Sequence, residues 1–108
     1  MKSDKYNKGM KVRREVLGDE YVDRALNLAT DFTKPLQDLV TENCWGEIWT
    51  KDVIPNKTRS LITIAILSSL KANTELKGHV LGALRNVQKK RFKMYYYNVQ
   101  FIVEFQRE

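Results

Sequence analysis

The sequence contains few of the residues that build redox and metal sites. Its one cysteine, Cys44, excludes an internal disulfide, a zinc site built from several cysteines and a Cys-x-x-Cys redox pair. It also has a single histidine, His79, and no His/Cys/acidic cluster at metal-ligand spacing. Glycine-rich phosphate loops and nucleophile elbows are missing as well. We therefore expect no metal site.

Long apolar stretches are also missing. No stretch reaches the roughly 18 uninterrupted apolar residues of a membrane span, and the N-terminal MKSDKYNKG lacks the apolar run of a signal peptide. Together with the low cysteine content, this predicts a cytoplasmic protein without a membrane partner. The 108 residues, 43% hydrophobic and 30% charged, have the size and composition of one folded domain.

Charge and aromatic residues are distributed unevenly along the chain. Nineteen Lys and Arg against thirteen Asp and Glu give a net charge of +6. Residues 1–86 carry fourteen basic and eleven acidic side chains, whereas residues 87–108 carry five and two, together with six of the eleven aromatic residues. The composition therefore divides the chain into a body, residues 1–86, and a basic and aromatic tail, residues 87–108.

The body is predicted to be helical throughout. Ser3 can cap a first helix that Gly18 ends, and a second helix is expected over residues 20–30. Thr33 can cap a third, with Pro35 in its first turn. Its expected buried face comprises Leu36, Leu39, Val40, Cys44 and Ile48, with Trp45 and Trp49 beside it.

Two further helices complete the body. Residues 56–71 include LITIAIL, which is apolar on every side and predicts a helix buried all round. Thr74 is expected to cap a last helix, whose apolar face includes His79. Consecutive helices with short connections indicate an all-α domain of antiparallel helical hairpins. The other helices of one chain are too few to cover this apolar helix on every side. We therefore expect the protein to be an oligomer.

Three polar residues among apolar neighbours are candidates for chemistry. His79 is either a packed histidine with one hydrogen bond or a general acid/base, since imidazole titrates near neutrality. Glu47, between Trp45 and Trp49, is either a solvated charge at a helix end or a carboxylate that orients His79 or carries a proton. Arg59 forms either a surface ion pair or a bidentate clamp on a substrate carboxylate.

Several segments in order resemble the 4-carboxymuconolactone decarboxylase family. They are KGMKVRREVLGDEYVDRAL, TDF, WGEIW, TRSLITIAIL and LKGHVLGALRN, which run from about Lys8 to Asn86. The resemblance implies an all-α fold assembled as trimers or hexamers. It also implies cofactor-free decarboxylation of a carboxylated muconolactone to an enol-lactone in the protocatechuate branch of aromatic degradation.

The resemblance also implies roles for individual residues. Glu47, Arg59 and His79 fall on polar positions of the family's motifs, with His79 and Glu47 as catalytic residues and Arg59 as a substrate ligand. Trp45, in the same segment as Glu47, is predicted to bind substrate. The related alkyl hydroperoxidase D-like branch uses a Cys-x-x-Cys pair. A thiol peroxidase is therefore the alternative that the lone Cys44, expected as a small core residue, disfavours.

The tail departs from the family. Shifting its back-translated reading frame by one base turns Met94 and the three tyrosines after it into Val-Leu-Leu. The following codons then permit the family's Gln-Cys-Ala-Ile-Tyr-Cys-Gly-Val-Pro ending. We infer a one-base frame slip near residues 86–87, which makes an inactive truncated homologue a further alternative.

The tail also has a pattern of its own. Between Tyr95 and Phe105 every odd position is apolar or aromatic, which predicts a strand or a poorly ordered segment. Its KKRFK run and tyrosines resemble a basic and aromatic nucleic-acid contact, an interpretation that we favour less than the enzymatic one.

Overall fold

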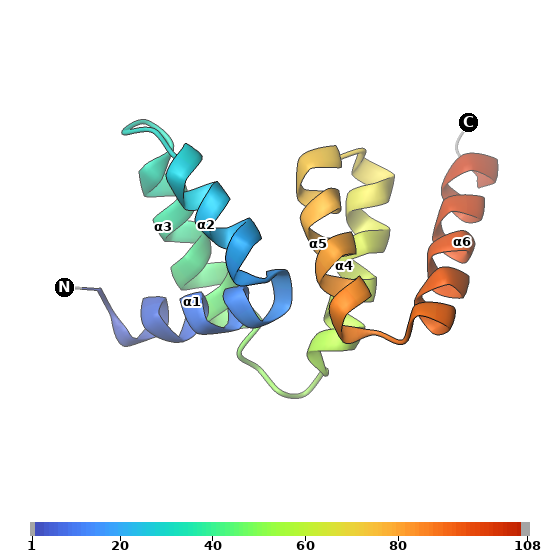
Figure 1. Ribbon diagram of the computed structural model, residues 1–108, viewed down its shortest axis with the longest axis horizontal. Coiled ribbons are helices and arrows are strands. Elements are labelled where there is room, and N and C mark those ends of the chain that lie inside the picture. The colour runs from blue at the N-terminus through green and yellow to red at the C-terminus, as the bar shows by residue number, and fades with distance from the viewer. Residues whose placement is uncertain (1, 107–108) are drawn as a thin grey trace. The chain divides into compact units, whose positions relative to one another are not determined.

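The computed structural model describes residues 2–106, and these residues form helices joined by short connections, without a strand (Figure 1). The helices are α1 (Asp4–Leu17), α2 (Asp19–Leu28), α3 (Lys34–Val40), the π-helical η1 (Thr41–Ile48), α4 (Asn56–Leu70), α5 (Asn73–Asn86) and α6 (Lys89–Gln106). The all-α prediction is confirmed. The chain forms two compact units, one that ends at Asn56 and one that begins at Lys57.

The ends of α1 follow the predicted capping chemistry. The Ser3 hydroxyl accepts a hydrogen bond from the Tyr6 amide at 3.0 Å, which satisfies one of the amides that a helix N-terminus leaves open. Gly18 ends the helix with φ of 91°, in the region that favours glycine. Across this corner Arg14 pairs with Asp19 at 3.1 Å and Asp23 at 2.8 Å, linking α1 to α2.

The first unit is built on a close crossing of α1 and η1. A Cβ on Gly9 would lie 2.1 Å from the Thr41 carbonyl oxygen and 2.6 Å from the Gly46 nitrogen, so the two backbones touch. Next to the crossing, Trp45 and Trp49 are buried with their ring centroids 4.6 Å apart. They form one core with Val16, Leu17 and Val22. Two glycines thus allow the WGEIW segment to pack directly on α1.

The predicted buried face of the third helix is wrong. Its apolar residues are exposed, Leu36 at 60%, Leu39 at 59% and Ile48 at 53% among them, and Cys44 is exposed too. The buried residues of η1 are Thr41, Trp45 and Gly46. The helix changes from α to π turns at Thr41, which a period of 3.6 does not describe. The face that meets α1 is therefore the one that carries Gly46 and the indole rings.

A buried guanidinium lies at the start of η1. Arg13 is only 6% exposed and donates hydrogen bonds to the Thr41 hydroxyl at 3.2 Å and to the Gln37 side-chain carbonyl at 3.0 Å. The Thr41 hydroxyl in turn donates to the Gln37 backbone carbonyl at 2.8 Å. Burial lowers the pKa of Arg13. These bonds hold α1 against the junction of α3 and η1.

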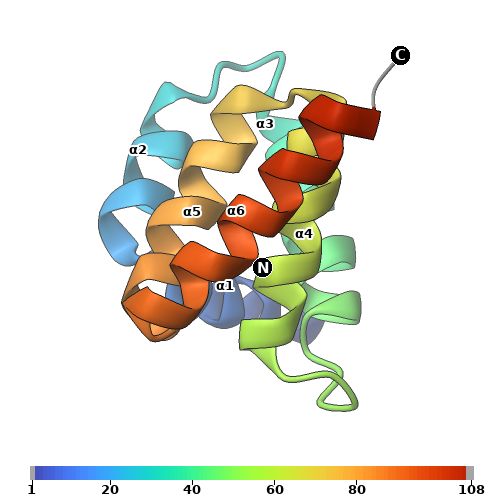
Figure 2. The same ribbon diagram turned by 90° about the vertical axis from the view of Figure 1, so that its right-hand side faces the viewer.

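The second unit is a three-helix arrangement of α4, α5 and α6. Figure 2 shows α6 in front, with α5 and α4 behind it. Ile64 of α4, Ala83 of α5, and Val87 and Phe92 form its core. The Gln100 amide donates a hydrogen bond to the buried Ser68 hydroxyl at 3.1 Å, which ties α6 to α4.

Two predictions on this unit are wrong. The tail is a helix rather than a strand, because Phe92 and Tyr96 lie one turn apart and pack into the core. The tyrosines on either side of Tyr96 hid that spacing. Helix α5 begins at Asn73 after Ala72, so Thr74 is not its cap. Helix α4 matches its predicted range, but Ile62 and Ile66 are 47% and 54% exposed, so it is not buried all round.

Candidate functional site

His79 lies within α5 in a largely buried position. Its Nδ1 atom is buried, and Gly78, next to it in the chain, is buried as well. Burial lowers the pKa of His79 from 6.5 to about 4, and the Glu75 carboxylate offsets part of this effect. The imidazole is therefore neutral at pH 7. It can accept one proton and donate one hydrogen bond.

Arg59 lies in the first turns of α4, as predicted. Its Nε atom is buried, although the residue as a whole is partly exposed. The Thr63 hydroxyl donates a hydrogen bond to the Arg59 backbone carbonyl at 2.7 Å, which fixes the turn on which the side chain stands. A partly buried guanidinium is well suited to binding a carboxylate, since the pairing is bidentate and weakly screened.

The α4–α5 hairpin carries both Arg59 and His79. The two helices are joined by only Lys71 and Ala72 and run antiparallel. Counted back from this turn, Arg59 is level with Leu84, five residues beyond His79. That offset is about 7.5 Å along the helix axis. Both predicted residues therefore stand on one hairpin, at levels that differ by five residues along its axis.

Glu47 lies in the first unit, on η1, in an environment that differs from the expected one. Its carboxylate lies between two ammonium groups, Lys5 at 3.6 Å and Lys51 at 3.5 Å, rather than between the indole rings of Trp45 and Trp49. The side chain is 46% exposed, and Lys51 and Lys5 hold the pKa of the carboxyl below its usual value. Its contacts are those of a solvated, ion-paired carboxylate.

Trp45 is 4% exposed and packs against Trp49 in the core of the first unit. Its side chain therefore helps to form the α1–η1 packing. The substrate contact expected of Trp45 stays a prediction.

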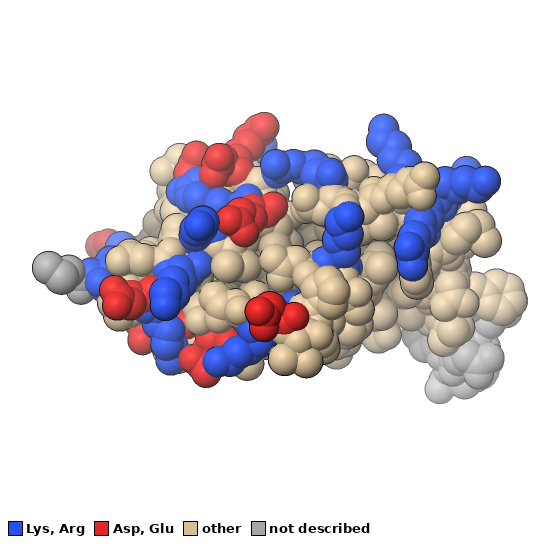
Figure 3. All heavy atoms as spheres, turned by 90° about the horizontal axis from the view of Figure 1, so that it is seen from below, with Lys and Arg blue, Asp and Glu red and all other residues tan. Residues whose placement is uncertain are grey.

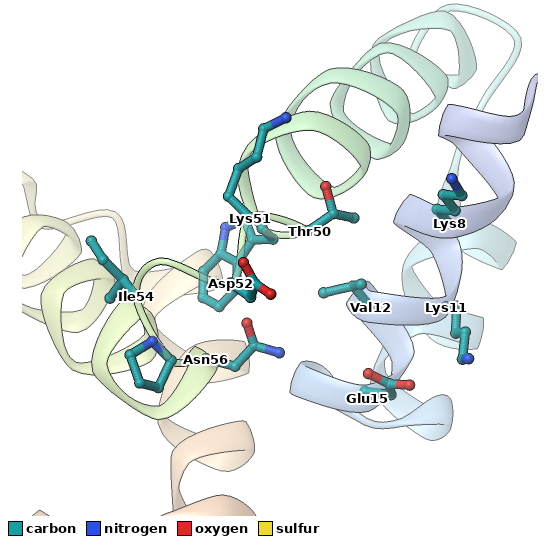
Figure 4. A pocket seen from close by; sticks show the side chains of 11 residues that line it. Lys8, Lys11, Val12, Glu15, Thr50, Lys51, Asp52, Ile54 and Asn56 are labelled. Carbon is teal, nitrogen blue, oxygen red and sulfur yellow. The ribbon is translucent and has the colours of Figure 1, made fainter.

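The first unit also contains an open groove of about 370 Å³ between α1 and the segment that follows η1 (Figure 4). Lys8, Lys11 and Lys51 contribute positive charge to its lining, and Glu15 and Asp52 negative charge. Trp49 and Val12 provide apolar surface. Glu47 lies in a neighbouring hollow that shares Lys8, Thr50 and Lys51 with this groove.

Comparison with known proteins places these residues in a family. The sequence pattern of the Carboxymuconolactone decarboxylase family matches residues 34–91, more than half of the chain. The chain belongs to this family. The matched range contains Glu47, Arg59 and His79, and it ends at Arg91, so that most of α6 lies beyond it.

Curated carboxymuconolactone decarboxylase relatives support the assignment. Nitrosuccinic acid decarboxylase npaB of Metarhizium robertsii is 46% identical over 81 residues, which are 75% of this chain and 57% of that protein. The 4-carboxymuconolactone decarboxylase of Acinetobacter baylyi is 39% identical over 82 residues, 76% of this chain and 61% of that protein. The chain thus spans about three fifths of the length of these relatives. No solved structure matches it significantly.

In this member of the carboxymuconolactone decarboxylase family, Cys44 is not the expected core residue. The residue is exposed on η1, while partial burial of its thiol raises the thiol's pKa. Thiolate is the reactive form of cysteine. A raised pKa therefore agrees with the prediction that thiol peroxidase chemistry is disfavoured.

Sequence reasoning missed Glu75. This residue stands four positions before His79 on α5, so both side chains lie on the same side of the helix. The i, i+4 spacing of Glu75 and His79 is the sequence signal for this pair.

Residues 2–106 lack two further features. No helix there is long and apolar enough to cross a membrane. The same residues contain no group of three or more His, Cys, Asp or Glu side chains that could hold a metal ion.

Proposed function

We propose that this chain is a decarboxylase of small carboxylated substrates, with a carboxylated muconolactone as the substrate and an enol-lactone as the product. The presence of Arg59 and His79 on one helical hairpin, inside the region that matches the family, carries the proposal. The relatives from two organisms that are both named decarboxylases support it. We place the reaction in protocatechuate degradation in the cytoplasm.

Decarboxylation has three requirements that the protein must meet. The substrate carboxylates must be held, the electron pair left by CO2 must be accommodated, and a proton must reach carbon. In this proposal the Arg59 guanidinium binds a carboxylate and fixes the lactone. The C–C bond to the departing carboxylate breaks, and its electron pair spreads through the conjugated lactone. His79 delivers the proton that quenches this pair.

The neutral state of His79 shapes the proton step. In the free protein burial keeps the pKa of this imidazole at about 4. A substrate that brings negative charge to the hairpin favours the imidazolium, because an opposite charge within a few ångströms raises the pKa of a histidine. His79 therefore gains its proton when the substrate binds and transfers it after CO2 leaves. Glu47 stays the predicted carboxylate partner that the family resemblance assigns.

A second substrate follows from the relative npaB, whose name gives nitrosuccinic acid as its substrate. The name describes an acid with two carboxylates and a nitro group, and a nitro group also stabilises negative charge on a neighbouring carbon. The same Arg59 and His79 roles would serve this acid. The 46% identity of npaB to this chain makes nitrosuccinic acid the second candidate.

We also propose that the active form is a homo-oligomer, a trimer or a hexamer. Ile62, Ile66 and Leu70 follow one another at four-residue intervals on α4 and are 47%, 54% and 71% exposed. A second copy would cover this stripe. Light scattering during size-exclusion chromatography tests the proposal, and a monomer at micromolar concentration would contradict it.

The function is tested by incubating the full-length protein with each acid and following CO2 and product by NMR. Wild-type protein is expected to convert the carboxylated lactone. The loss of a positioned proton donor is expected to lower kcat by about 100-fold or more in His79→Gln. Arg59→Lys is expected to raise KM, since lysine cannot reproduce the bidentate contact. Full activity in His79→Gln would refute the assignment. An inactive wild-type chain with both acids would identify it as the inactive homologue.

A further inference from the structure

In the second unit, helix α5 carries an acidic side chain one turn before His79. This residue, Glu75, and His79 are four residues apart on α5, so their Cβ atoms lie about 5–6 Å from each other. Counted from the connecting turn, Glu75 lies nearest the turn, His79 follows, and Arg59 on α4 is level with a point beyond His79. Imidazole thus lies between guanidinium and carboxylate along the axis.

We propose that Glu75 is the positioning carboxylate of His79, holding the imidazole ring and stabilising its protonated form during the reaction. The inference rests on the proposed decarboxylase function. Glu75 acts through His79 and is not required to touch the substrate. Nothing in the family comparison assigns a role to this residue.

The surroundings of the two candidate carboxylates favour Glu75 over Glu47. Glu47 already neutralises Lys5 and Lys51, at 3.6 and 3.5 Å, and is part of the first unit. Glu75 is on the same helix as His79, one turn away, so their proximity is fixed by the helix itself. The coupling therefore does not depend on a contact between separate elements.

Burial makes the protonated form of His79 costly. Burial disfavours the charged imidazolium strongly, with the pKa near 4, while the Glu75 carboxylate raises the pKa. This unit also carries cations, Arg59 on α4 and a group at the start of α6, and a cation close to the ring would disfavour the imidazolium. The cations on α6, between Lys89 and Lys93, lie near the C-terminal end of α5, because the α5–α6 connection is short. Glu75 lies near the opposite end of α5. Glu75 is thus placed to offset the cost of protonating His79.

The basic surface near α6 is consistent with this division of charge. On the face shown in Figure 3, basic and acidic side chains alternate over the first unit, whereas the α6 end carries basic side chains. A carboxylate on α5 therefore stands in a mostly positive unit. Removal of the Glu75 charge should lower the pKa of His79, which that carboxylate raises.

The decisive measurement is an NMR titration of His79 in the full chain without substrate. Glu75→Gln is expected to lower the pKa of His79, by up to about one unit for a charge one helical turn away. Glu75→Asp keeps the charge and is expected to restore most of the wild-type value, and it serves as the second variant if the glutamine variant does not fold. Glu47→Gln is the matched comparison and is expected to leave the His79 titration where it is.

Kinetics supply the second readout. With the carboxylated lactone, Glu75→Gln is expected to lower kcat by up to about tenfold with KM unchanged, since a one-unit shift changes the imidazolium population tenfold. A purely structural role for Glu75 would leave the His79 titration unmoved. An unchanged titration in Glu75→Gln, or a larger shift in Glu47→Gln, overturns the inference even if the wild-type protein is active. A wild-type chain that releases no CO2 from either acid refutes the proposed function, while the titration still reports on the pair.

Discussion

Acidification should destabilise the folded protein through His79. The pKa of this side chain is lowered from 6.5 to about 4 by burial, so between these two values the unfolded chain binds a proton that the folded chain does not. Stability from the neutral buried imidazole is present above pH 6.5 and is lost as the pH falls toward 4. The free energy of unfolding should therefore fall across this window.

The magnitude follows from the two pKa values. Linkage gives a loss of about 2 kcal/mol between pH 7 and pH 5, and about 3 kcal/mol by pH 4. Glu47 and Asp38 have lowered pKa values and also weaken the fold in acid. Their contributions occur in both proteins when wild type is compared with His79→Gln, so they cancel in the difference.

The assay is urea unfolding of both proteins at pH 7, 6 and 5, followed by circular dichroism at 222 nm because both units are helical. Wild type is expected to lose about 2 kcal/mol more than His79→Gln between pH 7 and pH 5. Two pH profiles that run parallel would refute the argument that burial holds His79 neutral.

Three further predictions concern the first unit. Gly9→Ala should destabilise it by about 2 kcal/mol or more in thermal unfolding, because the new Cβ meets backbone atoms that cannot move aside. The control Asn7→Ala, exposed on the same helix, should cost nothing, and equal melting temperatures for the two variants would contradict the close crossing. Arg13→Ala should lower the unfolding free energy by about 2 kcal/mol, because packing and the hydrogen bonds to Thr41 and Gln37 are lost. A urea midpoint equal to that of the wild type would contradict this. Cys44 should react with iodoacetamide more slowly at pH 7 than a free thiol does, since its pKa is raised; a faster rate would reopen the thiol peroxidase alternative.

The sequence was most informative where local chemistry decides the structure. The Ser3 cap, the Gly18 stop, Pro35 in a first turn and the range of α4 depend on neighbouring residues, and each is observed as predicted. The Thr74 cap failed because α5 begins at Asn73, which places Thr74 inside the helix. A cap that is chemically available is not always used.

The packing faces were harder to predict because they depend on partners distant in the sequence. The π turns of η1 bring Gly46 against Gly9, and this long-range contact decides that Trp45 is buried while Leu36 and Leu39 are exposed. In the tail, alternation of aromatic residues suggested a strand. Tertiary packing of Phe92 and Tyr96 against α5 selects a helix instead.

The positions of the candidate residues in the fold were predictable to different degrees. Arg59 and His79 stand on adjacent helices of one hairpin, an arrangement that follows from two short-range predictions. Glu47 was chosen because it lies between two tryptophans in the sequence, but its contacts are with Lys5 and Lys51. Sequence neighbours on a helix point in different directions, whereas residues four apart share a side, as Glu75 and His79 do on α5.

The most direct test of the account is the release of CO2 from the carboxylated muconolactone, measured with the full chain and with His79→Gln under the same conditions. We predict one CO2 and one enol-lactone for each substrate consumed by the wild type, and a rate lower by about 100-fold or more in the variant. Equal rates for the two proteins would contradict the central role given to the buried imidazole.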